Sequence, residues 1–226
     1  MSIMSYLRTI RALLWKDILL EWRSKEISIP VFVFSVLVIM VFNFVFDTAS
    51  ISLVLLAPGI LWISIIFGGV IGFNRSLSAE KETGGIHGLM MSPVERDVIF
   101  FGKMLSTLVF LLVVEVLIFV VFSVLFNFSL FTPLFILLAV LATLGMSLVG
   151  TLFSAIAVTT RSREVMLPIL FLPVVLPLII ATVEATGTLM VEGVTKDLFH
   201  WVSLLVIFDS VFLVICPVAF TFIIED

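Results

Sequence analysis

Apolar residues along this chain fall into six long runs, separated by short polar segments. A helix that crosses the hydrocarbon of a bilayer needs about 20 apolar residues, or roughly 17 to 25 allowing for tilt. Each run meets this length, so the pattern predicts an all-α membrane protein with six transmembrane helices. The predicted spans are residues 27–46, 51–73, 103–126, 131–158, 165–183 and 200–224.

The composition agrees with lipid as the solvent of this chain. It is 62% hydrophobic and only 12% charged, whereas soluble domains are about half apolar and about a quarter charged. Cys216 is the single cysteine, which excludes an intrachain disulfide and a cysteine-based metal site. Charge runs through the first 29 residues and no A-x-A-like cleavage site follows a short apolar core. We therefore expect the first span to remain as an anchor.

Basic residues indicate the orientation. All but one of the 12 Lys and Arg residues lie before the first span, in residues 74–103, or in residues 159–164; the other is Lys196. Because basic residues stay on the cytoplasmic side, both termini and these two basic segments are expected in the cytoplasm. Residues 184–199 are expected outside, and the prolines of the preceding span suggest a re-entrant outer segment there.

Residues 1–26 are expected to form a helix that precedes the transmembrane domain of residues 27–226. From residue 10 on, apolar side chains recur every four residues, with one more a turn earlier, and most of the arginines fall elsewhere on the helical wheel. Tryptophan and arginine suit the headgroup level, so we interpret this segment as an amphipathic helix along the cytoplasmic interface. The alternative is a cytosolic helix packed on a partner. The repeated apolar residues are Leu7, Ile10, Leu14, Ile18 and Trp22.

The segment 74–102 is too polar to span and too long for a tight turn. Charged residues precede a flexible Gly pair, a short apolar helical face follows, and Pro93 disfavours helix at the residue before it. We predict a short amphipathic helix that offers apolar residues to a partner, with a plain interfacial connector as the alternative. The residues expected to make this contact are Glu80, Glu82, Gly84, Gly85, Ile86, Leu89, Met90, Ser92 and Pro93.

This segment resembles the coupling segment of exporter-type ABC transporter permeases, which docks on an ATP-binding subunit. Together with the sequence LLAPGILW at residues 55–62, it resembles the CcmB family, the haem-exporter permease subunit of bacterial cytochrome c maturation. The specific match covers residues 58–103, and the rest agrees in length, span number and orientation.

The resemblance implies that this chain lies in the bacterial inner membrane and has a set of partners. They are a CcmA-type ATP-binding subunit, CcmC-like and small membrane subunits, and a periplasmic haem chaperone, with two copies of the permease and of the ATPase. Haem would be a transported or handled ligand, and ATP would bind the partner subunit. No cofactor bound by this chain and no nucleic-acid partner is expected.

The sequence holds no phosphate loop for ATP. The motif G-x-x-x-x-G-K-[ST] surrounds phosphates with backbone amides, but Gly102-Lys103 is followed by Met104 and has Asp97 where the first Gly belongs. The chain is therefore not expected to be an enzyme.

Two carboxylates interrupt apolar spans, namely Glu115 and Asp209. Burying a charge in the bilayer is costly, so such residues are functional candidates by default. Glu115 lies 12 residues after Lys103, about 18 Å along a helix, and no basic residue lies at similar depth. We expect a protonated or water-facing Glu115, with a neutral carboxyl bonded to a neighbouring helix as the alternative to a transport role. Asp209 is expected nearer the outer face, within reach of a hydrated cavity.

Small residues predict where helices approach closely, because membrane helices pack through Gly, Ala, Ser and Thr. The predicted packing residues are Gly68, Gly72, Thr143, Ser147, Gly150 and Thr151. They could join helices of one monomer or of two copies. In the fifth span, three prolines remove helical hydrogen bonds and predict kinks or a break. They are Pro168, Pro173 and Pro177.

Only His87 and His200 could ligate haem iron through an imidazole. His87 falls in the coupling segment, and His200 is more simply an interfacial residue beside Trp201, so ligation is not the preferred interpretation. Three functions remain open: a permease for haem export or release of a haem-loaded chaperone, a permease for lipid, polysaccharide or drug, and a passive scaffold or channel.

Overall fold

The computed structural model describes residues 3–47, 53–82, 94–127, 130–160 and 163–225, and all regular elements in these ranges are α-helices. Six of them are long and apolar enough to cross a membrane, so the predicted all-α fold with six spans is confirmed. The helices are α1 (Ile3–Ser24), α2 (Ser28–Asp47), α3 (Leu53–Glu82), α5 (Arg96–Phe126), α6 (Pro133–Thr159), α7 (Arg163–Val191) and α8 (Lys196–Glu225).

Helix α6 lies at the centre of the bundle. It packs against α3, α5, α7 and α8, whereas α2 packs on α3 and α5. In the spanning stretches of α3 and α6, 67% of the residues are buried, but in that of α2 only 17% are. Helix α2 is therefore peripheral. The outer faces of α2, α5, α7 and α8 carry exposed apolar side chains such as Leu37, Leu117, Ile180 and Val214. These faces suit contact with lipid tails, which are as apolar as leucine.

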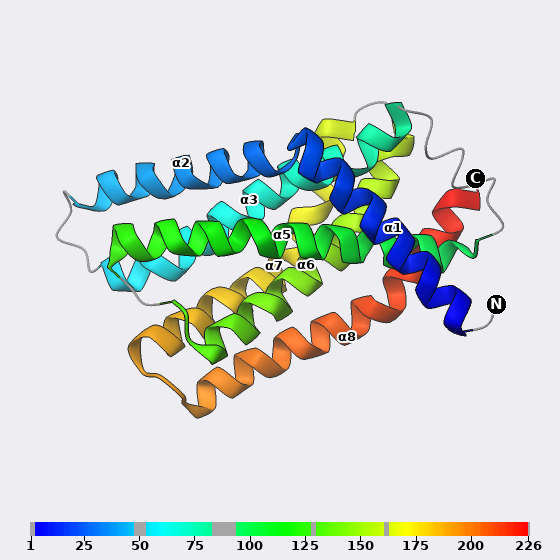
Figure 1. Ribbon diagram of the computed structural model, residues 1–226. Coiled ribbons are helices and arrows are strands. Elements are labelled where there is room, and N and C mark those ends of the chain that lie inside the picture. Colours follow the sequence, from blue (N-terminus) through cyan, green and yellow to red (C-terminus); the bar gives the residue numbers. More distant parts are fainter. Residues whose placement is uncertain (1–2, 48–52, 83–93, 128–129, 161–162, 226) are drawn as a thin grey trace.

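Both ends of the chain lie at one end of the bundle, as Figure 1 shows. We call this the termini end. Helix α1 crosses obliquely over α5 there and packs against it. The helix predicted for residues 1–26 is therefore present, while its place at a membrane interface stays a prediction.

The helices at the termini end are longer than the spans predicted from polarity. Helix α3 continues to Glu82 and α5 already begins at Arg96, so both helices extend beyond the predicted span ends at residues 73 and 103. Polarity marks where a span leaves the lipid, but Ser, Ala, Glu and Lys all continue a helix in water at little cost. The short helix predicted around Leu89 falls outside the described residues.

The predicted outer loop, residues 184–199, is also mostly helical. Helix α7 runs to Val191 and α8 starts at Lys196, so only residues 192–195 separate the two helices, and a re-entrant course relative to the membrane stays a prediction. Packing extends α7: Thr186 is fully buried, and its hydroxyl accepts a hydrogen bond of 2.9 Å from the Trp62 indole on α3. Tertiary contact thus continues the helix where composition predicted a loop.

Helix α7 passes through all three of its prolines as one element. Pro168, Pro173 and Pro177 lie inside Arg163–Val191, so of the two predicted outcomes, kinks or a break, a break is not seen. The bend that prolines impose on a helix stays a prediction at these positions.

Candidate functional site

In the sequence, the predicted coupling residues fall at the end of α3 and in the stretch between α3 and α5. Glu80 and Glu82 belong to the last turn of α3, and the other seven, from Gly84 to Pro93, fall outside the described residues. Helix α3 leads into this segment and α5 emerges from it at Arg96. The docking surface itself therefore stays a prediction, but its two attachment points are the termini-end extensions of α3 and α5.

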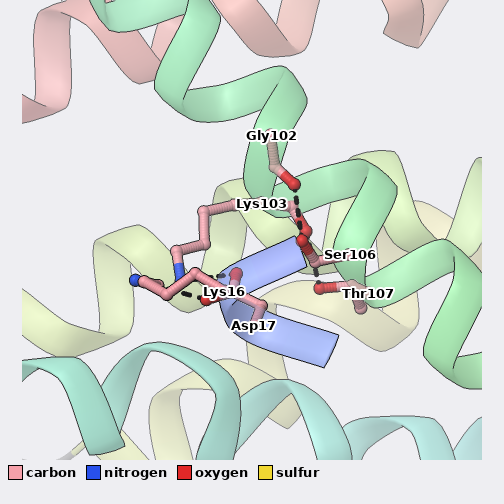
Figure 2. Close-up of polar contacts among 6 residues, drawn as sticks. All are labelled: Lys16, Asp17, Gly102, Lys103, Ser106 and Thr107. Atoms are coloured by element: carbon pink, nitrogen blue, oxygen red, sulfur yellow. Dashed lines mark hydrogen bonds and ion pairs between the residues drawn. The ribbon is translucent and has the colours of Figure 1, made fainter. Parts of the chain in front are cut away.

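A buried ion pair joins α1 to the N-terminal part of α5. Figure 2 shows Lys103 of α5 reaching Asp17 of α1, with Nζ 2.9 Å from Oδ2. The Lys103 side chain is only 4% exposed, so its charge depends on such a partner. Lys16 stands 3.3 Å from the other Asp17 oxygen but is 41% exposed. Gly102 permits the approach, because a Cβ there would lie 2.8 Å from Leu13 of α1.

Two further contacts fix α1 in place. The Tyr6 hydroxyl donates to Asp97 Oδ2 on α5 over 3.3 Å. Burial, with the nearby Asp97 carboxylate, raises the pKa of Tyr6, so the phenol keeps the proton that it donates. At the other end of α1, Glu21 Oε1 accepts bonds from the backbone N–H of Ile27 and Ser28 at 3.2 and 2.8 Å. A carboxylate at these free N–H groups caps the start of α2.

Glu115 lies inside the bundle and contacts α6. It is 1% exposed, and the Thr143 hydroxyl is 2.8 Å from both carboxyl oxygens and 2.6 Å from the Ala139 carbonyl. A hydroxyl carries one proton, so Thr143 can donate to one of these oxygens only. A protonated Glu115 would supply the second proton, donating to Thr143 while Thr143 donates to Ala139. A water-facing Glu115 is not what the structure shows.

Asp209 is enclosed within the bundle, and its predicted position nearer the outer face stays a prediction. It lies near the midpoint of α8, is 5% exposed, and neither carboxyl oxygen has a hydrogen-bond partner in the described part of the chain. It faces Gly145 of α6, where a Cβ would lie 2.6 Å from Oδ1. The missing side chain of Gly145 thus makes the room that the carboxyl occupies.

Several of the predicted packing residues contact neighbouring helices of the same chain, whereas a role between two copies stays a prediction. A Cβ on Gly68 would lie 2.5 Å from the Ser35 oxygen of α2, and Gly150 of α6 is covered by the Phe73 ring of α3. Ser154 also donates to the Phe73 carbonyl over 2.7 Å. Three other small residues belong to the predicted set. Gly72 faces Ile27 and Val31, and both Ser147 and Thr151 are buried. These residues hold α2, α3 and α6 together.

Of the two histidines, His200 is exposed and packs edge-on against Trp201, with ring centroids 5.5 Å apart. His87 lies outside the described residues. Within the described residues, no group of three or more His, Cys, Asp or Glu side chains is placed to hold a metal ion.

Sequence reasoning missed the polar contacts of α1. From the sequence, no partner is predicted for Lys103, although a lysine that opens an apolar run needs a nearby carboxylate or water. That signal could have led to Asp17, which lies 86 positions earlier. Gly145 gave no signal, because only the fold shows what its missing side chain leaves room for.

These features define a multi-pass α-helical membrane protein whose described core holds two buried carboxyls. Comparison with known proteins makes the class specific. The family model described as CcmB protein matches residues 8–225, and the chain therefore belongs to the CcmB family. It is 25% identical over 163 residues to "Heme exporter protein B" of Pseudomonas aeruginosa. The aligned stretch covers 72% of this chain and 73% of that protein.

Proposed function

We propose that this chain is the permease subunit of an ABC-type haem exporter in a bacterial inner membrane. ATP hydrolysis by a separate subunit would be coupled to haem export, or to release of a haem-loaded chaperone, in cytochrome c maturation. The observation that carries this proposal is the CcmB match over residues 8–225, supported by a relative named as a heme exporter protein.

The placement of the coupling segment supports a mechanical role. Residues 83–95 connect α3, which is among the most buried helices, to α5, which carries Lys103 and Glu115. A force applied to this segment would therefore act directly on two helices that contact α6. The chain's part in the cycle is to receive that force and to change its helix packing.

The proposed partners follow the orientation. With the termini end in the cytoplasm, the coupling segment faces a CcmA-type ATPase, and two copies of each subunit form the core. CcmC-like and small membrane subunits would lie beside the spans, and a haem chaperone would approach the opposite, periplasmic end.

The test is a deletion strain complemented with tagged variants. Loss of the chain should abolish covalent haem attachment to c-type cytochromes while other exports continue. Substitutions at Gly84, Leu89 and Pro93 should reduce co-purification of the ATP-binding subunit and its ATPase rate. Ser203→Ala, an exposed site at the other end of the bundle, is the control and should change neither.

Two outcomes would contradict the proposal. If haem attachment survives the deletion while export of a lipid, polysaccharide or drug fails, the chain is a permease for another substrate. If a tagged chain brings down no ATP-binding subunit, the chain is a scaffold.

A further inference from the structure

One face of α1 is held by protein and the other is open. Asp17 and Glu21, the two acidic residues of this helix, both turn inward, to Lys103 and to the start of α2. Arg8, Arg11 and Arg23 are exposed. The inward contacts therefore fix the rotation of α1 so that its outward face carries positive charge without compensating acids.

The outward face is also apolar. Trp15 is 62% exposed and Trp22 78%, and Met4, Leu7 and Leu19 are exposed as well. Exposed tryptophans beside arginines on one helix face are typical of segments that lie in the headgroup region of a membrane. An aqueous surface would leave this apolar area exposed to water at a cost.

A shallow groove lies in the middle of this face. It has a volume of about 340 Å³ and is lined by Arg8, Arg11, Ala12 and Trp15. The two arginines are three positions apart and so share one side of the helix, and the small side chain of Ala12 leaves the space between them. Among the described residues, no ion pair involves Arg8 or Arg11.

We infer that this groove binds the phosphate of an anionic phospholipid of the cytoplasmic leaflet. Guanidinium groups bind phosphate oxygens through paired charge-assisted hydrogen bonds, and Trp15 would lie against the glycerol and upper acyl region. The apolar residues that flank the groove favour a lipid over an acidic segment of a partner protein. This inference does not depend on which substrate the chain transports.

Brominated lipids test it, because bromine quenches tryptophan at short range. The full-length chain, with the subunits that accompany it, is reconstituted in nanodiscs of phosphatidylcholine containing brominated phosphatidylglycerol or brominated phosphatidylcholine. The signal of Trp15 is obtained by subtracting that of Trp15→Phe. We expect stronger quenching by the anionic lipid, and a roughly 25-fold lower preference for it in Arg8→Gln/Arg11→Gln, from the usual effect of two basic residues at an anionic surface.

Arg23→Gln removes an exposed arginine of the same face outside the groove and serves as the control, which should keep the preference. Equal quenching by the two lipids, or an unchanged preference in the double variant, would overturn the inference. So would loss of the preference on adding inorganic phosphate, which would indicate a site for the free ion. Shielding of Trp15 from both lipids would show that a protein partner covers this face.

Discussion

Replacing Asp17 by Asn should detach α1 from α5 more than any other single charge removal on α1. The substitution keeps the size of the side chain but takes away the carboxylate 2.9 Å from the Lys103 ammonium, which is 4% exposed. Removing one partner of a buried ion pair costs about 3 to 5 kcal/mol. Because the Asp17 side chain is 17% exposed, water can reach part of the site, and we expect the lower end, about 3 kcal/mol.

The assay is a double-mutant cycle on the purified chain in detergent. The apparent free energy of unfolding is measured for Asp17→Asn, for Lys103→Met and for the chain with both changes, together with protease cleavage within residues 1–26. When both charges are absent, no ammonium is left buried beside an amide, so the double variant should lose less than the sum of the single ones.

Lys16→Met supplies the matched control. It removes the other cation beside Asp17, at 3.3 Å, but this lysine is 41% exposed. An exposed pair contributes about 0 to 1 kcal/mol, so this variant should stay close to the parent chain. If Asp17→Asn costs no more than Lys16→Met, or if the losses at Asp17 and Lys103 simply add, the Lys103 pair does not hold α1.

Three other predictions concern the spans. Glu115→Gln should insert and fold normally, since an amide still bonds Thr143, and unchanged haem attachment in a complementation assay would remove any transport role for the carboxyl. Gly145→Ala should lower the apparent free energy of unfolding through overpacking, by about 1 to 3 kcal/mol, and Asp209→Ala in the same chain should restore part of that loss. If nothing is restored, the added methyl group does not press on Asp209. His200→Ala should leave haem attachment intact, and its loss would point to an imidazole ligand.

The number and order of the spans could be predicted from the sequence because the requirement is one of length and polarity alone. A run of about 20 apolar residues satisfies it whatever the packing, so all six spans were found. The helix ends depend on tertiary contacts instead. The outer end of α7 is helical where Thr186 meets Trp62, and neither residue carries a local sign of that bond.

The candidate site divides in the same way. Glu115 could be singled out because a carboxyl in an apolar run is unusual at any position, but its partner Thr143 was read only as a packing residue. Asp17 and Lys103 are 86 positions apart, and Gly145 matters only through Asp209 on α8. Such pairs are properties of helix packing, which a single sequence does not specify.

The two buried carboxyls contact different sides of α6. Thr143, which contacts Glu115, and Gly145, which faces Asp209, are two residues apart on this helix, and two residues correspond to a rotation of about 200°. Glu115 on α5 and Asp209 on α8 therefore approach α6 from nearly opposite directions, with the α6 backbone between them. In this packing they cannot share one proton or one cation, so a rearrangement that brings α5 or α8 around α6 would change the surroundings of each carboxyl separately.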